Sequence, residues 1–145
     1  MKNIYIASDH AGFSLKESIK KKYSKKYNLF DLGPEKSSKS VNYPDYAHKL
    51  SKKINKKQNI GILVCGSGMG MSMSANKHKN IRAALCYSVK IAKLSRLHND
   101  ANVITLGERL ISKNLAFKCI NAFLNTKYEG GRHLKRVKKI EIYVE

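Results

Sequence analysis

The stretch IGILVCGSGMG, residues 60–70, is an apolar run of strand length that ends in Cys65 and continues into a glycine-rich turn. A continuous apolar run, in contrast to an alternating one, is typical of a strand in a parallel sheet covered on both faces. Similar short apolar runs recur along the chain, separated by segments with apolar residues at helical spacing. This alternation predicts an α/β fold with a parallel sheet flanked by helices.

The pattern predicts five strands and six helices in the 145 residues. The strands are expected at 3–7, 27–32, 60–65, 81–86 and 102–107, and the helices near 12–25, 43–56, 69–78, 88–98, 111–125 and from 132 onward. No internal repeat or linker divides the chain, which predicts a single domain, 1–145. The stretch 33–46 is the one long loop expected, and loops of that length are often functional.

The formal charge of +19 comes from 24 Lys and 5 Arg against 10 acidic residues. A nucleic-acid-binding protein is one explanation, because lysines neutralise phosphates and release counterions. No helix-turn-helix, zinc-finger or RNA-binding aromatic motif accompanies the lysine runs. We therefore assign most lysines to solvated helix faces and do not expect nucleic acid as a partner. A weak attraction for anionic substrates follows in either case.

The chain has three cysteines, Cys65, Cys86 and Cys119, without metal-ligand spacing. An odd number with no C-x-x-C pair indicates free thiols in a reducing compartment. No apolar run approaches the ~20 residues of a membrane helix, and the N-terminal stretch lacks the features of a signal peptide. We expect a cytoplasmic protein with no membrane partner, and we expect Cys86 and Cys119 to lie in the core.

Reactive side chains follow several predicted strands. Asp9 and His10 come after the first strand, Cys65 after the third and Arg109 after the fifth. The segment 98–100, His-Asn-Asp, lies just before the fifth strand. Because ligands of open α/β sheets bind outside the carboxyl ends of the strands, we expect a site there.

The glycine-rich turn does not match the common nucleotide-binding motifs. It lacks both the G-x-G-x-x-G spacing and the Lys of a P-loop, and Cys65 and Met69 occupy the flanking positions of a hydrolase G-x-S-x-G around Ser67. Its backbone N–H groups could hold a phosphate or an oxyanion formed during reaction. Cys65 is then either a small buried hydrophobe or a thiolate that acts as a base or nucleophile.

The five arginines stand out in a chain that otherwise uses lysine. Arg132 and Arg136 are one helical turn apart, which suits bidentate capture of a phosphate, and Arg109 could join them. The alternative is that all three are ordinary surface charges.

Six motifs occur in order along the chain: SDHAGF (8–13), NYPDYA (42–47), CGSGMGMSMSANK (65–77), IRAALC (81–86), SRLHNDANVITLG (95–107) and YEGGRHLKRV (128–137). Together they resemble the type B ribose-5-phosphate isomerases, in the family that also contains the galactose-6-phosphate isomerases. The resemblance implies a three-layer Rossmann-like fold with a five-stranded parallel sheet and a C-terminal helix used in dimerisation. It also implies interconversion of ribose 5-phosphate and ribulose 5-phosphate, in the pentose phosphate pathway, without a metal or cofactor.

The resemblance also implies roles for individual residues. Cys65 would be the base that moves a proton between C2 and C1, Ser67 would lie close to the substrate oxygens, and His98 would protonate the ring oxygen. Met71 stands where some relatives have a glutamate base, which points to the cysteine subclass. The implied substrate-binding residues are Asp9, His10, Tyr43, Gly66, Ser67, Gly68, Met69, Gly70, Asn99, Arg109, Arg132 and Arg136.

The implied active unit is a homodimer, with a homotetramer as the alternative. In it, Arg132 and Arg136 would reach the site of the partner subunit. Allose 6-phosphate and galactose 6-phosphate are alternative substrates in this family. We favour the pentose phosphate because the His-Asn pair and the Arg-rich tail occur together in this one chain.

Overall fold

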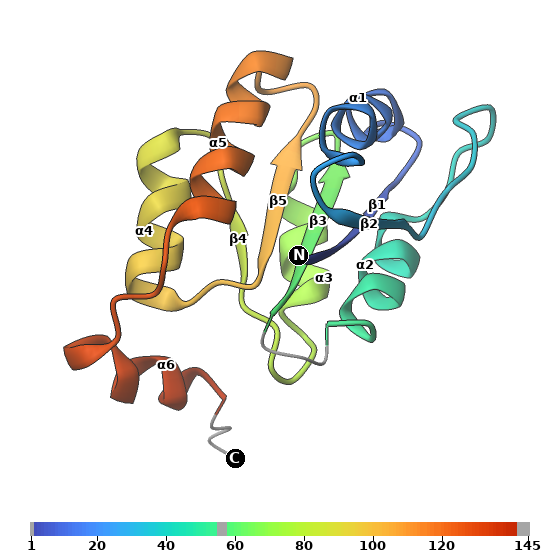
Figure 1. Ribbon diagram of the computed structural model, residues 1–145. Coiled ribbons are helices and arrows are strands. Elements are labelled where there is room, and N and C mark those ends of the chain that lie inside the picture. The colour runs from blue at the N-terminus through green and yellow to red at the C-terminus, as the bar shows by residue number, and fades with distance from the viewer. Residues whose placement is uncertain (1, 55–57, 142–145) are drawn as a thin grey trace.

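The computed structural model describes residues 2–54 and 58–141, which form a parallel sheet between two layers of helices (Figure 1). The strands are β1 (Asn3–Ser8), β2 (Asn28–Asp31), β3 (Asn59–Cys65), β4 (Ala83–Leu85) and β5 (Val103–Gly107), in the order β2-β1-β3-β5-β4. The helices are α1 (Phe13–Tyr23), α2 (Tyr43–Ser51), α3 (Met69–Ala75), α4 (Val89–Asn99), α5 (Lys113–Asn125), the 3₁₀ helix η1 (Gly131–His133) and α6 (Leu134–Ile140).

The predicted α/β fold with five parallel strands is confirmed, and the differences are at element ends. The helix expected at 43–56 ends at Ser51, and residues 55–56 of that prediction lie outside the described residues. The strand expected at 81–86 is shorter and spans Ala83–Leu85; just before it, the Arg82 backbone N–H donates to the side chain of Asn102. The helix expected from 132 onward begins as η1 and continues as α6, and 142–145 lie outside the described residues.

The two faces of β3 show why its apolar run is continuous. Every residue of β3 is buried. Ile62 and Val64 pack in one core with residues of α1, α4 and α5, whereas Leu63 and Cys65 pack in a second core with residues of α2 and α3. Since neighbouring residues of a strand point to opposite faces, both faces of this strand need apolar side chains. The same alternation places the Cys65 side chain on the α2–α3 face.

A buried ion pair connects α1 to the edge strand β2. The Lys16 side chain is fully buried, and its Nζ donates to both carboxylate oxygens of Asp31 at 2.9 Å and to the Pro34 carbonyl at 2.8 Å. Burial alone would raise the pKa of Asp31, but hydrogen bonds from Lys20 and Lys16 outweigh it, so that this pKa lies below its usual value of 3.8. The pair fixes the start of the loop that leads to α2.

The part of the chain that the structure describes contains no helix with the length and apolar character needed to cross a membrane.

We predict that Asp31→Asn lowers the free energy of unfolding by about 2–3 kcal/mol, because it removes the carboxylate closest to the buried Lys16 ammonium and leaves Glu17, at 3.4 Å, as its remaining counter-charge. Urea unfolding at pH 7 would measure this loss. In the wild type, the low pKa of Asp31 makes the pair stabilising above about pH 4, and this contribution is lost as the pH falls through the folded-state pKa. A double variant, Lys16→Met with Asp31→Asn, should recover part of the loss; a single variant as stable as wild type would contradict this account.

Candidate functional site

Residues from three strand ends and from α2 line one cleft. The register pairs Ser8 of β1 with Val64 of β3, and Cys65 of β3 with Gly107 of β5, so the loops that follow these strands emerge at one edge of the sheet. The cleft has a volume of about 370 Å³. Its lining residues are Asp9, His10, Ala11, Tyr43, Cys65, Gly66, Ser67, Gly70, Arg109 and Leu110.

The turn after β3 folds back over the Cys65 thiol. Gly68 has φ of +79°, a left-handed conformation that favours glycine, and its N–H donates to Cys65 Sγ at 3.1 Å. The Met69 N–H donates to Ser67 Oγ at 3.3 Å. The turn therefore directs a backbone N–H at the sulfur from the side of the cleft-lining glycines.

Asp9 and His10 are held in the cleft by backbone N–H groups. Asp9 is buried, and its Oδ1 accepts from the Gly12 N–H at 3.0 Å. The Val41 N–H donates to His10 Nδ1 at 3.1 Å, which leaves the proton of the neutral ring on Nε2. Val41 belongs to the long loop expected at 33–46, so this loop does contribute to the site by orienting a histidine.

Arg109 and Tyr43 close two sides of the cleft. A Cβ atom on Gly66 would come within 3.1 Å of Arg109 Nη1, so the guanidinium lies directly against the glycine turn. A Cβ on Gly70 would lie only 2.2 Å from the Tyr43 ring, so glycine is required there for the ring to pack on α3. Leu110 also lines the cleft and was not predicted from the sequence, because nothing in its local pattern distinguishes it from a loop residue.

The three cysteines lie in different surroundings. Cys86 and Cys119 are buried in the core, as predicted, and burial raises the pKa of the Cys119 thiol and raises that of Cys86 to about 12. Cys65 is also only 5% exposed, but its side chain borders the cleft. A small reagent that enters this cleft would therefore meet the Cys65 thiol, whereas Cys86 borders a separate pocket of about 280 Å³.

Four predicted site residues lie at the opposite end of the sheet. His98 and Asn99 end α4, which runs antiparallel to the strands and leads to the start of β5 (Figure 1). Arg132 and Arg136 lie on η1 and α6, below that end of α4. The length of β5, about 13 Å at 3.3 Å per residue, separates this group from Cys65 and Arg109. Within one chain the predicted residues thus form two separate groups.

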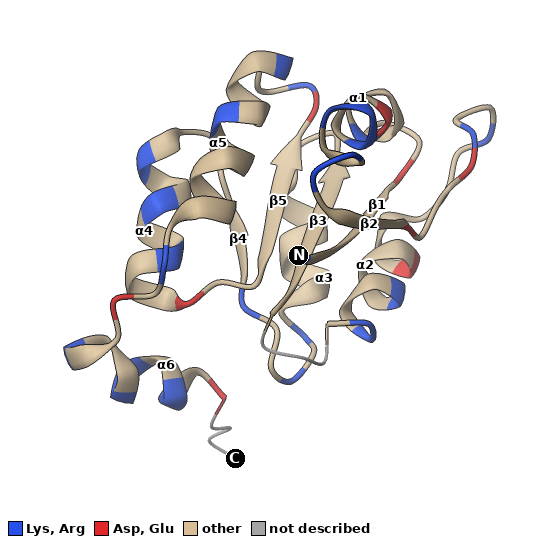
Figure 2. Ribbon diagram, viewed as in Figure 1, with Lys and Arg blue, Asp and Glu red and all other residues tan. Residues whose placement is uncertain are grey.

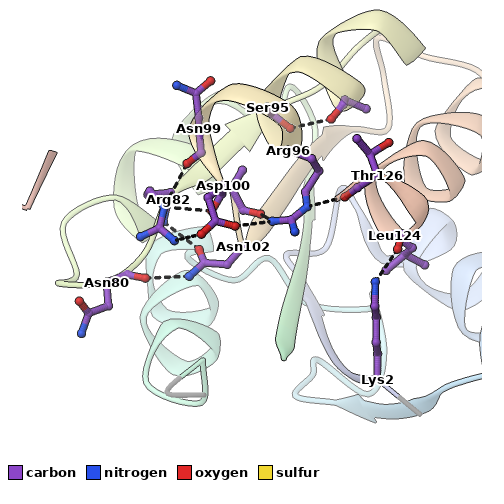
Figure 3. A network of polar contacts seen from close by, with 12 residues as sticks. Lys2, Asn80, Arg82, Ser95, Arg96, Asn99, Asp100, Asn102, Leu124 and Thr126 are labelled. Carbon is purple, nitrogen blue, oxygen red and sulfur yellow. Dashed lines mark hydrogen bonds and ion pairs between the residues drawn. The ribbon is translucent and has the colours of Figure 1, made fainter. Parts of the chain in front are cut away.

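Two arginines hold the end of α4 (Figure 3). Arg82 Nε donates to the carbonyls of Asn99 at 3.1 Å and of Asp100 at 2.9 Å. Arg96 Nη1 donates to Asp100 Oδ1 at 3.2 Å. The Asn99 side chain points away from this network, which leaves its amide available for other contacts. The planar forks of Arg82 and Arg96 therefore serve to cap a helix, a role that the sequence did not reveal.

His98, Glu129 and His133 offer three potential metal ligands, with ligand atoms within 4.8 Å of one another. The two imidazole rings are stacked, with centroids 4.3 Å apart and planes inclined by 17°. A metal ion binds an imidazole along the nitrogen lone pair, which lies in the ring plane. Nearly parallel rings cannot direct both lone pairs at one ion, so this arrangement does not fit a metal site. Glu129 and His133 belong to the motif YEGGRHLKRV, but no pattern in the sequence assigns them a role.

The chain resembles known proteins over nearly its full length. A family model described as Ribose/Galactose Isomerase matches residues 4–140. The chain is 42% identical to probable ribose-5-phosphate isomerase B of Mycoplasma genitalium, over 97% of this chain and 95% of that protein. It is 40% identical to ribose-5-phosphate isomerase B of Escherichia coli, over 97% of this chain and 95% of that protein.

Solved structures show the same similarity. The crystal structure of a ribose 5-phosphate isomerase from Thermotoga maritima matches with a TM-score of 0.93 at 46% identity, and the match covers 97% of each chain. The M. genitalium ribose-5-phosphate isomerase B with bound ribulose-5-phosphate matches with a TM-score of 0.87 at 42% identity, covering 96% of this chain and 93% of that one.

We predict that iodoacetamide at neutral pH modifies Cys65 and leaves Cys86 and Cys119 unmodified in the folded protein. The reagent needs a thiolate that it can reach, and the raised pKa values of the two core thiols suppress their ionisation. Peptide mass spectrometry would locate the label, with Cys65→Ser as the variant that should take up none. Earlier labelling of Cys86 or Cys119 than of Cys65 would contradict the assignment.

Proposed function

The chain belongs to the ribose/galactose isomerase family, and we propose that it interconverts D-ribose 5-phosphate and D-ribulose 5-phosphate. One relative named ribose-5-phosphate isomerase B is 40% identical to it, and two named probable ribose-5-phosphate isomerase B are 42% and 46% identical, each over nearly the full chain. One observation carries the proposal: the Cys65 thiol borders the cleft and accepts an N–H from the glycine turn that would stabilise the intermediate.

The proton-transfer step is assigned to Cys65. The thiolate removes the C2 proton of the opened aldose, and the freed electron pair forms the C1–C2 double bond while the carbonyl oxygen becomes an enediolate oxygen. Transfer of the O2 proton to O1 and return of a proton from sulfur to C1 give the ketose. Met71 is fully buried and apolar, so it offers no alternative base, which supports the cysteine subclass.

The glycine turn would stabilise the negative charge of the enediolate. Gly66, Ser67 and Gly70 line the cleft beside Cys65, the Gly68 N–H is directed at its sulfur, and the Ser67 hydroxyl lies on the same turn. Donors that are already oriented stabilise developing charge without the cost of reorganising water. The phosphate, several bonds from the reacting carbons, would be bound by Arg109 with Arg132 and Arg136.

Ring opening requires a separate acid. The furanose ring opens when its oxygen is protonated, the C1–O bond breaks and the C1 hydroxyl loses its proton to leave the aldehyde. We assign the protonation to His98, with Asp9 and His10 near the anomeric hydroxyl and Asn99 at a sugar hydroxyl. These groups act on one substrate although the single chain holds them at two ends of the sheet.

We infer that two copies of the chain complete each site. His98, Asn99, Arg132 and Arg136 from one chain would face the cleft of the other, and a two-fold axis would create two equivalent sites. Exposed apolar side chains lie beside both groups and support this arrangement: Met69 and Leu110 are 49% and 62% exposed near the cleft, and Leu134 and Ile140 are 46% and 55% exposed on α6. Exposed apolar surface of this kind marks a contact with another protein.

We further infer that the protein is a single-domain cytoplasmic enzyme of the pentose phosphate pathway. All three cysteines are free thiols, which a reducing compartment maintains. Lysine and arginine residues are spread over all the helices except α3 (Figure 2), as expected for solvated faces.

Cys65→Ala should lower the turnover of ribose 5-phosphate by about 10³-fold or more, since a positioned general base contributes about 10²–10⁴ and this base has no substitute. Coupled assay of ribulose 5-phosphate would measure the loss, and circular dichroism would confirm an unchanged fold. The matched control Cys86→Ala should retain turnover within about threefold, because its thiol only packs in the core. Unchanged turnover of Cys65→Ala would rule out the base assignment, and faster wild-type turnover of allose or galactose 6-phosphate would rule out the substrate.

Mixed dimers should test the two-chain site. Cys65→Ala and His98→Asn chains, each inactive alone, should regain about a quarter of wild-type activity after refolding in equal amounts, because half of the dimers are mixed and each has one intact site. The measurement is the steady-state rate of ribose 5-phosphate conversion after mixing, compared with the rate of each variant alone. If the two residues acted within one chain, mixing would restore nothing.

A further inference from the structure

The His98 imidazole lies against a second histidine that the proposed reaction does not use. The His133 ring is stacked on it at 4.3 Å, with planes 17° apart. The Glu129 carboxylate faces the same edge of both rings, with Oε2 at 3.9 Å from His98 Nε2 and 3.6 Å from His133 Nε2. His98 is therefore in contact with a flat ring on one side and a carboxylate at its edge.

His133 is a buried histidine whose ring nitrogen Nε2 is unpaired in the part of the chain that the structure describes. Its side chain is 9% exposed, and within the described residues its Nε2 has no hydrogen-bond partner. An unpaired buried polar atom is destabilising, so an apolar residue would pack here more favourably. Burial, with His98 and Arg132 nearby, lowers the pKa of His133, so its ring is neutral at neutral pH. A neutral, flat ring can lie beneath another imidazole without charge repulsion.

The segment that carries Glu129 and His133 is fastened to α4 itself. The Glu129 N–H donates to the Leu97 carbonyl at 3.1 Å, and the His133 N–H donates to the Gly130 carbonyl at 3.1 Å. At the far end of α6, Glu141 pairs with Arg82, the residue that also caps α4. The stacked ring and the carboxylate therefore keep a fixed position relative to His98.

Resting on the proposed function, we propose that His133 and Glu129 are positioning residues for ring opening, which hold the His98 imidazole in the plane from which it protonates the ring oxygen. The His98 side chain is 38% exposed in the single chain, and a ring with that exposure turns readily about its last side-chain torsion. Stacking on His133 restricts this rotation, and the Glu129 carboxylate fixes which edge of the ring faces the segment. Proton transfer needs an N–H directed at one oxygen within hydrogen-bond distance, so a rotated ring would be ineffective.

Ring opening can be separated from the proton-transfer step by experiment. Ribulose 5-phosphate is acyclic, because the hydroxyl that would close its furanose ring carries the phosphate. Exchange of its C1 proton with deuterium from D₂O, followed by NMR, reports the step at Cys65 without any ring chemistry. Net conversion of ribose 5-phosphate requires both steps. A residue that serves ring opening affects conversion and leaves exchange unchanged.

We expect His133→Ala to lower net conversion of ribose 5-phosphate by about 10–100-fold, the range for a misplaced catalytic group, while C1 exchange stays within about threefold of wild type. His133→Phe should recover most of the conversion, because it restores a flat ring for stacking. Glu129→Gln should show the same pattern with a smaller loss. The Glu129 side chain is 55% exposed, so we expect this variant to stay folded. The controls are His78→Ala, in the segment after α3, and Glu17→Gln, in α1. They remove the same chemical groups elsewhere in the molecule and should change neither readout.

Three results would overturn the proposal. Conversion at the wild-type level in His133→Ala would show that the stack is not needed. Parallel losses of exchange and conversion in both His133→Ala and Glu129→Gln would indicate a general structural role. Equal losses in His133→Phe and His133→Ala would exclude stacking as the cause. Failure of the proposed function itself would be distinct, because the wild type would then neither convert ribose 5-phosphate nor exchange the C1 proton of ribulose 5-phosphate.

Discussion

The close contact between the turn after β3 and the end of β5 determines how the Cys65 thiol, the glycine turn and Arg109 lie in the cleft. Cys65 pairs with Gly107 across the two strands, and a Cβ atom on Gly107 would lie 2.6 Å from the backbone of Ser67. A Cβ on Gly68 would lie 2.9 Å from the Leu106 backbone. Only glycine permits this approach. The approach bends the turn over the thiol, directs the Gly68 N–H at sulfur and brings the Arg109 guanidinium against Gly66. In the proposed reaction the glycines would therefore shape a site for the charge formed next to sulfur, and not a cradle for the bound phosphate.

The same constraint explains why three cysteines differ in chemistry. Cys86 and Cys119 lie where burial raises the pKa of each thiol, and they contribute packing. Cys65 lies at the carboxyl end of a central strand, where the sheet ends and the cleft begins. The three residues are chemically identical, so their position relative to the sheet edge decides which thiol is available for a reaction.

The strands, the helices and the cleft residues at the strand ends could be predicted from the sequence, because they depend on local patterns. Apolar runs and helical periodicity located the strands and helices, and the rule that ligands bind at carboxyl ends of strands located Asp9, Cys65 and Arg109. The contacts of His98 could not be predicted in this way. They depend on how the segment after α5 packs back on α4 through the Glu129–Leu97 hydrogen bond, which is a long-range contact without a periodic signal. For the same reason Arg82 and Arg96 could not be recognised as helix-capping residues.

In the proposed site, a single substrate molecule contacts two chains. A crystal structure of this protein with ribulose 5-phosphate would test it most directly. We predict that C1 and C2 lie about 3–3.5 Å from Cys65 Sγ of one chain, the range for reacting atoms, and that the phosphate or hydroxyl oxygens contact His98, Arg132 or Arg136 of the other. A ligand bound away from Cys65, or one contacted by residues of a single chain only, would contradict the account.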